Sequence, residues 1–268
     1  MKIKYVFGII LIFLLINNMI GCFEPKATEF FNKELEATDN TILSVNTING
    51  QIEISVWEND TISFNAIKKS SISKGELEKI NININENENM IEINTVYNGD
   101  RLTTPTVDMN IKVPESVTVK SAKTSNGGIQ ISGTKGDVVA TTSNGAIVID
   151  NVNGYVSAIT SNGRIEVTQT TGIKELKSSN MGIEVEIYDF KDNLKITTSN
   201  GGITAYINPL LNADINMSTS NGKISIEGVS LNLSVSENKH KSGILGDGGD
   251  TIDIITSNGN IFLKKLDI

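Results

Sequence analysis

Apolar and polar residues alternate in short segments along most of the chain, and the alternation itself is repeated. The segment Thr-Ser-Asn-Gly-x-Ile-x-apolar recurs from residue 124 onward, with serine in place of threonine once. Apolar residues two apart on both sides of a Ser-Asn-Gly corner predict two strands per repeat, each with one inward face. Glycine and asparagine tolerate positive φ, and serine and asparagine side chains bond local backbone, so the corner residues suit a turn.

The repeat has a nearly constant length. Its asparagines are Asn126, Asn144, Asn162, Asn180, Asn200, Asn221 and Asn258. They are separated by 18, 18, 18, 20, 21 and 37 residues, so the last gap holds about two periods. Two strands of this length cannot bury their apolar faces alone, whereas stacked copies can. The sequence therefore predicts an all-β fold, a single-stranded parallel β-helix (β-solenoid) with about 18–21 residues per coil and a rise of about 4.8 Å between coils.

Stacking would place equivalent residues of successive coils in vertical files. The asparagines would form a structural ladder of hydrogen-bonded side-chain amides. A core isoleucine column would consist of Ile129, Ile147, Ile165, Ile183, Ile203, Ile224 and Ile261. Asn180 is followed by Met181 where the other copies have glycine. Either Asn180 itself has the unusual φ, or this coil bends; both alternatives stay open here.

Three further regions complete the predicted organisation. Residues 41–120 contain a degenerate first copy at 43–54, alternating segments at 61–67, 90–96 and 107–113, and a short helix at 74–80. We expect them to begin the solenoid and to cap its first edge. Residues 121–268 hold the solenoid repeats. Within them, residues 236–250 are polar and rich in glycine, which predicts an irregular loop and a place for a binding contact.

The N-terminus resembles an export signal. Lys2 and Lys4 precede an apolar run at 6–16, which is shorter than the roughly 20 residues of a transmembrane helix. The run ends in Met-Ile-Gly-Cys, which resembles a lipoprotein signal box. We therefore predict a lipoprotein signal peptide at residues 1–21, lipidation of Cys22 and a lipid-anchored spacer at 22–40. An ordinary signal peptide with an incidental cysteine, or an uncleaved anchor, are the alternatives.

The cysteine count and the net charge limit how the fold is stabilised and which partners it can bind. Cys22 is the only cysteine, so no intramolecular disulfide forms and packing must stabilise the fold. The formal net charge is -8, and removal of residues 1–21 takes away two lysines and no acid, giving -8 - 2 = -10. An acidic body argues against nucleic acid as a partner.

The sequence offers little catalytic chemistry. The sole histidine, His240, lies between two lysines in the predicted loop, and the serines recur at a structural position. Glu166, Glu184 and Glu186 fall on adjacent coils, where they are candidates for paired carboxylates, but outward acids are expected on any solvated sheet. The segment 246–253 is similar to calcium-binding Gly-Asp repeats, yet it occurs once. We predict no catalytic residue, no metal site and no cofactor, hence no enzyme.

The Thr-Ser-Asn-Gly-x-Ile copies, the degenerate start at 48–54 and the closing segment at 246–261 together resemble the "putative adhesin" family. This is a domain of unknown function in bacterial and archaeal envelope proteins, similar to the toastrack β-solenoids of envelope stress signalling. The resemblance covers residues 43–263. It implies a β-helix outside the membrane and supplies no catalytic residues.

These observations lead to two functional hypotheses. The first is a surface interaction module, extracytoplasmic and attached to membrane lipid through acylated Cys22, that binds envelope glycan or other envelope proteins through its strand faces and the 236–250 loop. The alternative is a structural or sensory envelope component that acts by self-assembly. An uncapped final coil at 261–268 would favour the alternative. The oligomeric state stays open.

Overall fold

The computed structural model describes residues 25–100 and 104–268. The predicted signal peptide and Cys22 lie outside these residues. In the described ranges the chain forms twenty-three strands and one short helix, α2 (Lys74–Leu77), so it is nearly all β. No helix in these ranges is long and apolar enough to cross a membrane.

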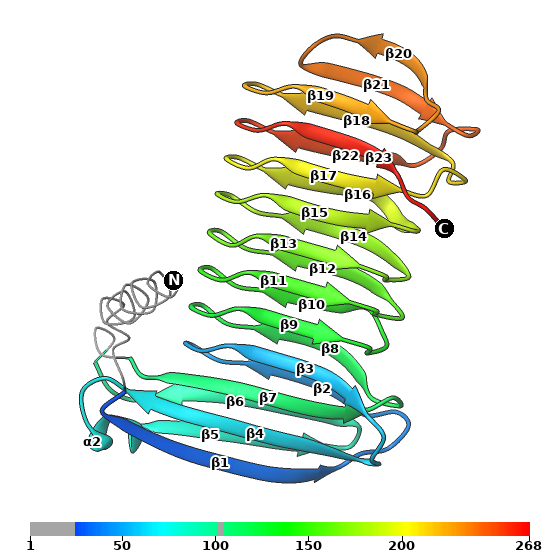
Figure 1. Cartoon of the computed structure of the whole chain (residues 1–268). Coiled ribbons are helices and arrows are strands. Elements are labelled where there is room, and N and C mark those ends of the chain that lie inside the picture. The colour runs from blue at the N-terminus through cyan, green and yellow to red at the C-terminus, as the bar shows by residue number, and fades with distance from the viewer. Residues whose placement is uncertain (1–24, 101–103) are drawn as a thin grey trace, which may run out of the picture.

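The strands form two long sheets that face each other along a single stack (Figure 1). In spatial order, sheet A contains β1 (Ala27–Glu36), β4 (Thr61–Ser70), β7 (Thr106–Pro114), β3 (Ile52–Trp57), β9 (Ile129–Ser132), β11 (Ile147–Asp150), β13 (Ile165–Thr168), β15 (Ile183–Ile187), β17 (Ile203–Ile207), β23 (Ile261–Lys265) and β19 (Ile224–Glu227). Sheet B contains β20 (Asn232–Ser236), β21 (His240–Leu245), β18 (Ala213–Thr219), β22 (Thr251–Thr256), β16 (Phe190–Thr198), β14 (Gly172–Lys177), β12 (Tyr155–Ile159), β10 (Val138–Thr141), β8 (Thr118–Lys123), β2 (Ile42–Asn46), β6 (Met90–Tyr97) and β5 (Ile80–Asn87).

Each coil consists of one strand from sheet B, a Ser-Asn-Gly corner and one strand from sheet A. Neighbouring coils pair in parallel, so the predicted β-solenoid is confirmed. The degenerate copy is the first coil, because Ile52 pairs in register with Ile129. Above it, the isoleucine column continues without a break through Ile147, Ile165, Ile183, Ile203, Ile261 and Ile224.

The core lies between the two sheets. Ile165 and its neighbours in the column are almost completely buried, with Ile224 at the tip the most exposed at 7%. On the sheet B side the facing file runs from Ala122 and Ala140 to Leu176 and Ile196. Small residues therefore oppose isoleucine in the lower coils and larger ones in the upper coils. Along each strand, inward apolar residues alternate with outward polar ones, and this alternation fixes the register, because a shift by one residue would turn the apolar side chains to solvent.

The last coil in the sequence is not the last coil in space. β23 lies between β17 and β19, and β22 lies between β16 and β18. Residues 261–268 therefore do not form an uncapped final coil, and the strand at this edge of sheet A is β19. The turn from β21 to β22, residues 246–250, brings the chain back to this position. It passes the beginning of β18, where Asp214 N–H donates to the Asp250 carbonyl at 3.1 Å.

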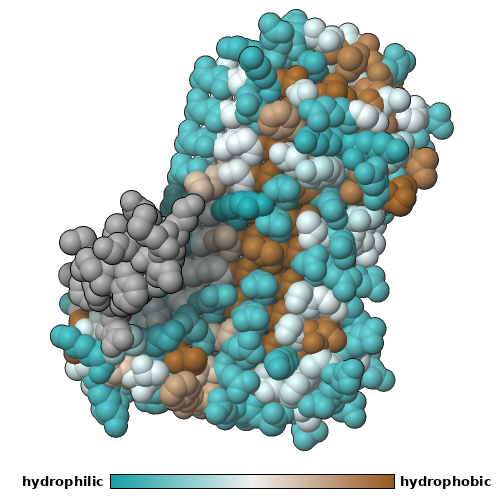
Figure 2. Space-filling view, viewed as in Figure 1, coloured by the Kyte–Doolittle hydropathy of each residue, from teal (hydrophilic) through white to brown (hydrophobic). Residues whose placement is uncertain are grey.

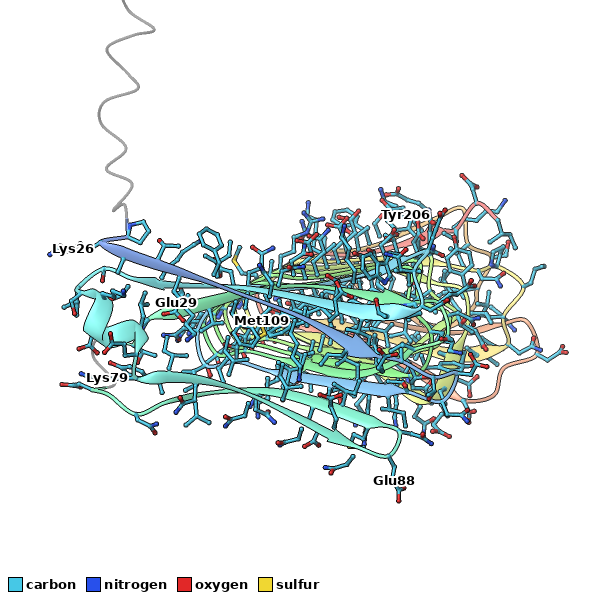
Figure 3. All side chains as sticks on the ribbon, turned by 90° about the horizontal axis from the view of Figure 1, so that it is seen from below. Lys26, Glu29, Lys79, Glu88, Met109 and Tyr206 are labelled. Carbon is cyan, nitrogen blue, oxygen red and sulfur yellow. The ribbon has the colours of Figure 1, made fainter. Side chains whose placement is uncertain are left out.

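The base of the stack is made by strands that leave the coil pattern. β1 pairs antiparallel with β4, β4 antiparallel with β7, and β5 antiparallel with β6. Figure 3 shows this end from below, with Lys26 at the start of β1 and Glu88 at the turn between β5 and β6. Residues 41–120 thus contain the first coil and most of the base.

Two predicted segments differ in the structure. Residues 27–36, expected within the spacer at 22–40, form β1, because Leu35 is buried and the Phe31 ring packs 5.7 Å from the Phe64 ring. Residues 240–245, expected within the irregular loop at 236–250, form β21, which pairs antiparallel with β18 and buries Leu245. Only the turns on either side of β21 remain as loops.

Candidate functional site

The Ser-Asn-Gly corners form one edge of the stack. Asn126 Nδ2 donates to Asn49 Oδ1 at 2.5 Å, which adds the first coil to the ladder. The same bond joins each higher pair at 2.6–2.9 Å, in the order Asn144, Asn162, Asn180, Asn200, Asn258 and Asn221. All of these bonds run in one direction, and the seven repeat asparagines are exposed. Because every neighbouring amide is engaged by the next, we interpret this edge as structural.

A second file beside the ladder was not singled out from the sequence. The threonine two residues before each asparagine is buried, and its hydroxyl donates to a main-chain carbonyl of the neighbouring coil. Thr142 Oγ1, for example, donates to the Gly127 carbonyl at 2.9 Å, and Ser178 Oγ donates to the Gly163 carbonyl at 3.0 Å. The recurrence of threonine or serine at this position was the signal, because a buried hydroxyl needs a partner.

The candidate carboxylates on the outer face of sheet A do not form an acid pair. Arg164 contacts Glu166 at 2.9 Å and Glu184 at 2.8 Å, while Glu186 Oε2 accepts the main-chain N–H of Gln169 at 2.9 Å. Figure 2 shows this side of the molecule, where hydrophilic residues flank a narrow apolar band along the stack. Glu184 and Glu186 therefore act as surface contacts between coils, while Glu166 contacts Arg164 of its own coil.

The other sequence candidates lie near the tip. His240 is exposed at the start of β21, and residues 246–250 form the turn from β21 to β22, where Gly246, Gly248 and Gly249 have positive φ. In that turn Asp247 N–H donates to Asn212 Oδ1 at 2.9 Å. Among residues 25–100 and 104–268, no group of three His, Cys, Asp or Glu side chains is placed to hold a metal ion.

A hollow of about 490 Å³ opens at the second corner of the coils, opposite the asparagine edge. We call it the corner pocket. It is lined by Asn151, Val152, Asn153, Gln169, Thr170, Thr171 and Tyr188. Val152 and Thr170 are buried, and the remaining residues offer side-chain amides, a hydroxyl and a phenol. Three successive coils contribute to it, since the residues follow β11, β13 and β15.

The backbone around the corner pocket adopts an unusual conformation. Asn151 and Gln169, in equivalent positions of neighbouring coils, have φ of 52° and 51°. A left-handed conformation costs a residue other than glycine about 1–2 kcal/mol. Hydrogen bonds between coils hold it, since Asn151 N–H donates to the Thr168 carbonyl at 3.1 Å and Thr171 Oγ1 to Asn153 Oδ1 at 3.2 Å. The pocket residues are thus positioned before any ligand arrives.

Tyr188 closes the upper side of the pocket. Partial burial raises the pKa of its phenol above the usual value, and the nearby Glu186 carboxylate raises the pKa further. The Tyr188 hydroxyl can donate a hydrogen bond as well as accept one.

A cluster of charged and phenolic groups borders the pocket. Tyr155 Oη donates to Asp189 Oδ2 at 2.7 Å, and this bond raises the pKa of Tyr155. The main-chain N–H of Tyr155 donates to Asp137 at 3.0 Å and lowers the pKa of that carboxyl, with Lys191 Nζ at 3.3 Å adding to the effect. These contacts tie four coils together beside the hollow.

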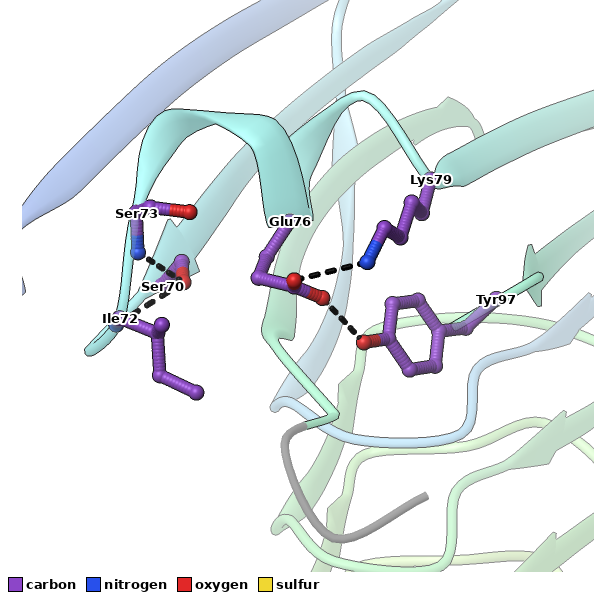
Figure 4. Close-up of polar contacts among 6 residues, drawn as sticks. All are labelled: Ser70, Ile72, Ser73, Glu76, Lys79 and Tyr97. Carbon is purple, nitrogen blue, oxygen red and sulfur yellow. Dashed lines mark hydrogen bonds and ion pairs between the residues drawn. The ribbon is translucent and has the colours of Figure 1, made fainter. Parts of the chain in front are cut away.

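A different polar cluster holds α2 on the base (Figure 4). Glu76 accepts hydrogen bonds from Lys79 Nζ at 2.8 Å and from Tyr97 Oη at 2.5 Å, and both lower its pKa, Lys79 the more strongly. Ser70 Oγ accepts the main-chain N–H groups of Ile72 and Ser73. Every group in this cluster bonds within the cluster, which indicates a role in fixing the helix.

Comparison with known proteins gives a family and a set of similar folds. The family model "Toastrack DUF4097" matches residues 31–264. No curated protein matches the chain.

Among solved structures, a "putative cell adhesion protein" from Clostridium sporogenes is 16% identical, with 90% of this chain and 100% of that one covered and a TM-score of 0.35. A "putative adhesin" from Bacteroides fragilis is 10% identical, with coverage of 89% and 97% and a TM-score of 0.46. A "putative lipid binding protein" from Parabacteroides distasonis is 9% identical, with coverage of 91% and 99% and a TM-score of 0.34.

Proposed function

Because the chain belongs to the toastrack family, as its repeats predicted, we propose that it is an adhesin-like interaction module of the cell envelope that binds glycan in the corner pocket. We propose further that a lipid on Cys22 holds it at a membrane surface outside the cytoplasm. The observation that carries the binding proposal is the corner pocket itself, where amides, a hydroxyl and a phenol from successive coils converge on one hollow.

The chemistry of the corner pocket suits a sugar. Sugar hydroxyl groups both donate and accept hydrogen bonds, and side-chain amides and hydroxyls do the same. Asn153, Gln169, Thr171 and Tyr188 supply such groups around a buried floor. A few placed polar groups in a pre-formed hollow are typical of small-ligand sites. The conformation of Asn151 and Gln169 supports the same proposal, since strained backbone is concentrated at functional sites.

Charge favours a neutral glycan over an acidic one. Asp150, Glu186 and Asp189 lie near the corner pocket, and the mature chain would have a net charge of -8 - 2 = -10. A polyanionic chain would be repelled by this surface. Neutral or N-acetylated sugars would meet no such barrier.

The anchor would place the base of the solenoid close to the membrane. Four residues, and so five Cα–Cα steps, separate Cys22 from Ala27 at the start of β1, so this link spans at most about 18 Å. We expect the mature N-terminus of the exported protein to be diacylated or triacylated Cys22. Mass spectrometry of the membrane-extracted chain checks this, and Cys22→Ala should release the chain from the membrane fraction. An unmodified cysteine, or a membrane-bound Cys22→Ala chain, would rule out the lipid anchor.

Glycan binding is tested by calorimetric titration of the full-length protein in detergent with neutral N-acetylglucosamine oligosaccharides. Asn153→Ala and Thr171→Val each remove a pocket hydrogen bond, so we expect each to weaken binding by about 2- to 10-fold. Asn83→Ala, on the exposed face of β5, is the matched control and should bind as the unaltered chain does.

Two results would count against this assignment. If the unaltered protein takes up no neutral oligosaccharide, the corner pocket is not a glycan site. If binding occurs but Asn153→Ala and Thr171→Val leave it intact, the glycan is bound elsewhere. The self-assembly hypothesis stays the alternative proposal, but residues 261–265 lie inside the stack, so the edge strand that it would use in sheet A is β19.

A further inference from the structure

Two aromatic side chains lie next to each other on the outer face of sheet A, above the corner pocket. Tyr206 is on β17 and Phe262 is on β23. The register pairs Tyr206 with Lys264 and Thr204 with Phe262, so the two rings are diagonal neighbours on one face. Both are partly exposed, and Figure 3 shows Tyr206 at the outer surface. We call Tyr206, Phe262 and Lys264 the aromatic platform.

Lys264 supplies the polar group of the platform. Its Nζ lies 5.9 Å from the centre of each ring, which places the cation against both aromatic side chains. Its carboxylate partner, Glu227 on β19, is 3.6 Å away and half exposed. An exposed ion pair of this kind contributes little. The ammonium group can therefore donate to a ligand hydroxyl without giving up a strong contact.

The platform exists because of the unusual order of the coils. Phe262 and Lys264 come from the last coil of the sequence, which is inserted between β17 and β19. If the coils followed the sequence, β17 would pair with β19, and Tyr206 would lie beside Glu227 instead. The inserted coil thus converts an ordinary polar face into an aromatic one.

The corner pocket and the aromatic platform lie on adjacent coils. Glu186, two residues before Tyr188 of the pocket, pairs with Tyr206 of the platform. Asn208 Nδ2, from the coil of Tyr206, donates to the Tyr188 carbonyl at 3.1 Å. Gln169, Tyr188, Tyr206 and Lys264 thus come from four successive coils, which rise by about 4.8 Å each and span about 14 Å.

We propose that the corner pocket and the aromatic platform form one binding track along the stack for an extended neutral polysaccharide. Sugar rings have apolar faces that pack on aromatic rings, while their hydroxyl groups bond to amides and to Lys264. A track across several coils suits a polymer better than a single sugar, because each additional unit finds a contact already held close to it. This proposal rests on the glycan-binding function and adds the length and direction of the ligand.

The track predicts that affinity depends on ligand length. Calorimetric titration of the full-length protein with N-acetylglucosamine dimer and hexamer should give at least 10-fold tighter binding of the hexamer. Tyr206→Thr and Phe262→Thr copy the outward threonines at Thr168 and Thr204, so the strands keep residues that this face already accepts. Each should weaken the hexamer at least 5-fold and leave the dimer within 2-fold. Phe30→Ala, which removes a 70% exposed ring from β1, is the matched control and should change neither.

The outcomes separate this proposal from the one on which it rests. Equal affinity for dimer and hexamer, or an unchanged hexamer affinity in both threonine variants with unaltered melting temperature, overturns the track and leaves the corner pocket as a site for a short sugar. Absence of binding for both oligosaccharides overturns the glycan function and the track together.

Discussion

At the scale of single residues, the glycine after the repeat asparagine closely approaches the backbone of the neighbouring coil, and Met181 takes its place only after Asn180. A Cβ on Gly163 would overlap the carbonyl oxygen of Gly145 in the coil below, whereas a Cβ on Gly128 would lie 3.4 Å from the Ala146 carbonyl oxygen. The position of Gly128 already holds Ala146 and Arg164 in other coils. Gly163 therefore has no room for a Cβ atom and Gly128 has, although both lie in the same type of corner.

We expect Gly163→Ala to lower the free energy of unfolding by about 1–3 kcal/mol, because the backbone must move away from Gly145. Gly128→Ala is the matched control and should stay within about 0.5 kcal/mol of the unaltered chain. Urea unfolding followed by circular dichroism measures both. Equal stabilities for the two variants would show that the close approach to Gly145 is not the reason why position 163 is glycine.

This distinction was not available from the sequence. The pattern indicated that glycine and asparagine serve a positive φ at the corner, and left two explanations for Met181. The structure gives Asn180 no positive φ, so that explanation is wrong. Met181 holds its side chain half exposed at the edge of the stack. Close approach between coils depends on the rise and the exact path of two turns, which a one-dimensional repeat does not contain.

At the scale of elements, the strands of the repeats were predictable, and the alternating segments at 61–67, 90–96 and 107–113 also form the strands β4, β6 and β7. The isoleucine column predicts the strands of sheet A because one residue type recurs at a nearly constant spacing. β1 was missed because Glu29 and Lys33 share its alternate positions with Phe31 and Leu35, so polar residues mask the pattern. Glu29 lies there because it pairs with Lys68 of β4 at 2.9 Å, a contact between distant parts of the chain.

The corner pocket illustrates the same limit. Asn151, Gln169 and Tyr188 come from turns that share no motif, and only stacking brings them together. The sequence pointed instead to the 236–250 segment, because glycine and polar residues are typical of loops. Much of that segment is β21, which faces Gly243 and Leu245 inward and so offers little apolar pattern to detect.

At the scale of the whole molecule, the order of the coils in space cannot be predicted from the repeat. Every coil has the same corner and the same isoleucine, so each strand can pair with any other in the same register. Ile261 fits between Ile203 and Ile224 as well as it would fit beyond them. The connections decide the order, since the hairpin of β20 and β21 occupies the free side of β18 and sends the chain back.

The inserted coil leads to a prediction that its place in the sequence would not suggest. Deletion of residues 246–268 removes a chain end, and chain ends are often dispensable. Here the deleted part contains Ile252, Ile254, Ile261 and Leu263, all completely buried. Fully burying such side chains stabilises a protein by about 1.5–3 kcal/mol each, and their loss would leave β17 and β19 without a shared partner.

We therefore expect the melting temperature of the chain lacking residues 246–268 to fall by more than about 10 °C, since about 1 kcal/mol corresponds to 2–4 °C at this size. Deletion of Asp267 and Ile268 alone, both exposed after β23, should leave it within about 2 °C. Differential scanning calorimetry of the three chains measures the difference. If the chain with the long deletion melted like the complete chain, β22 and β23 would not be an integral part of the stack. The aromatic platform, which needs their insertion, would then be ruled out.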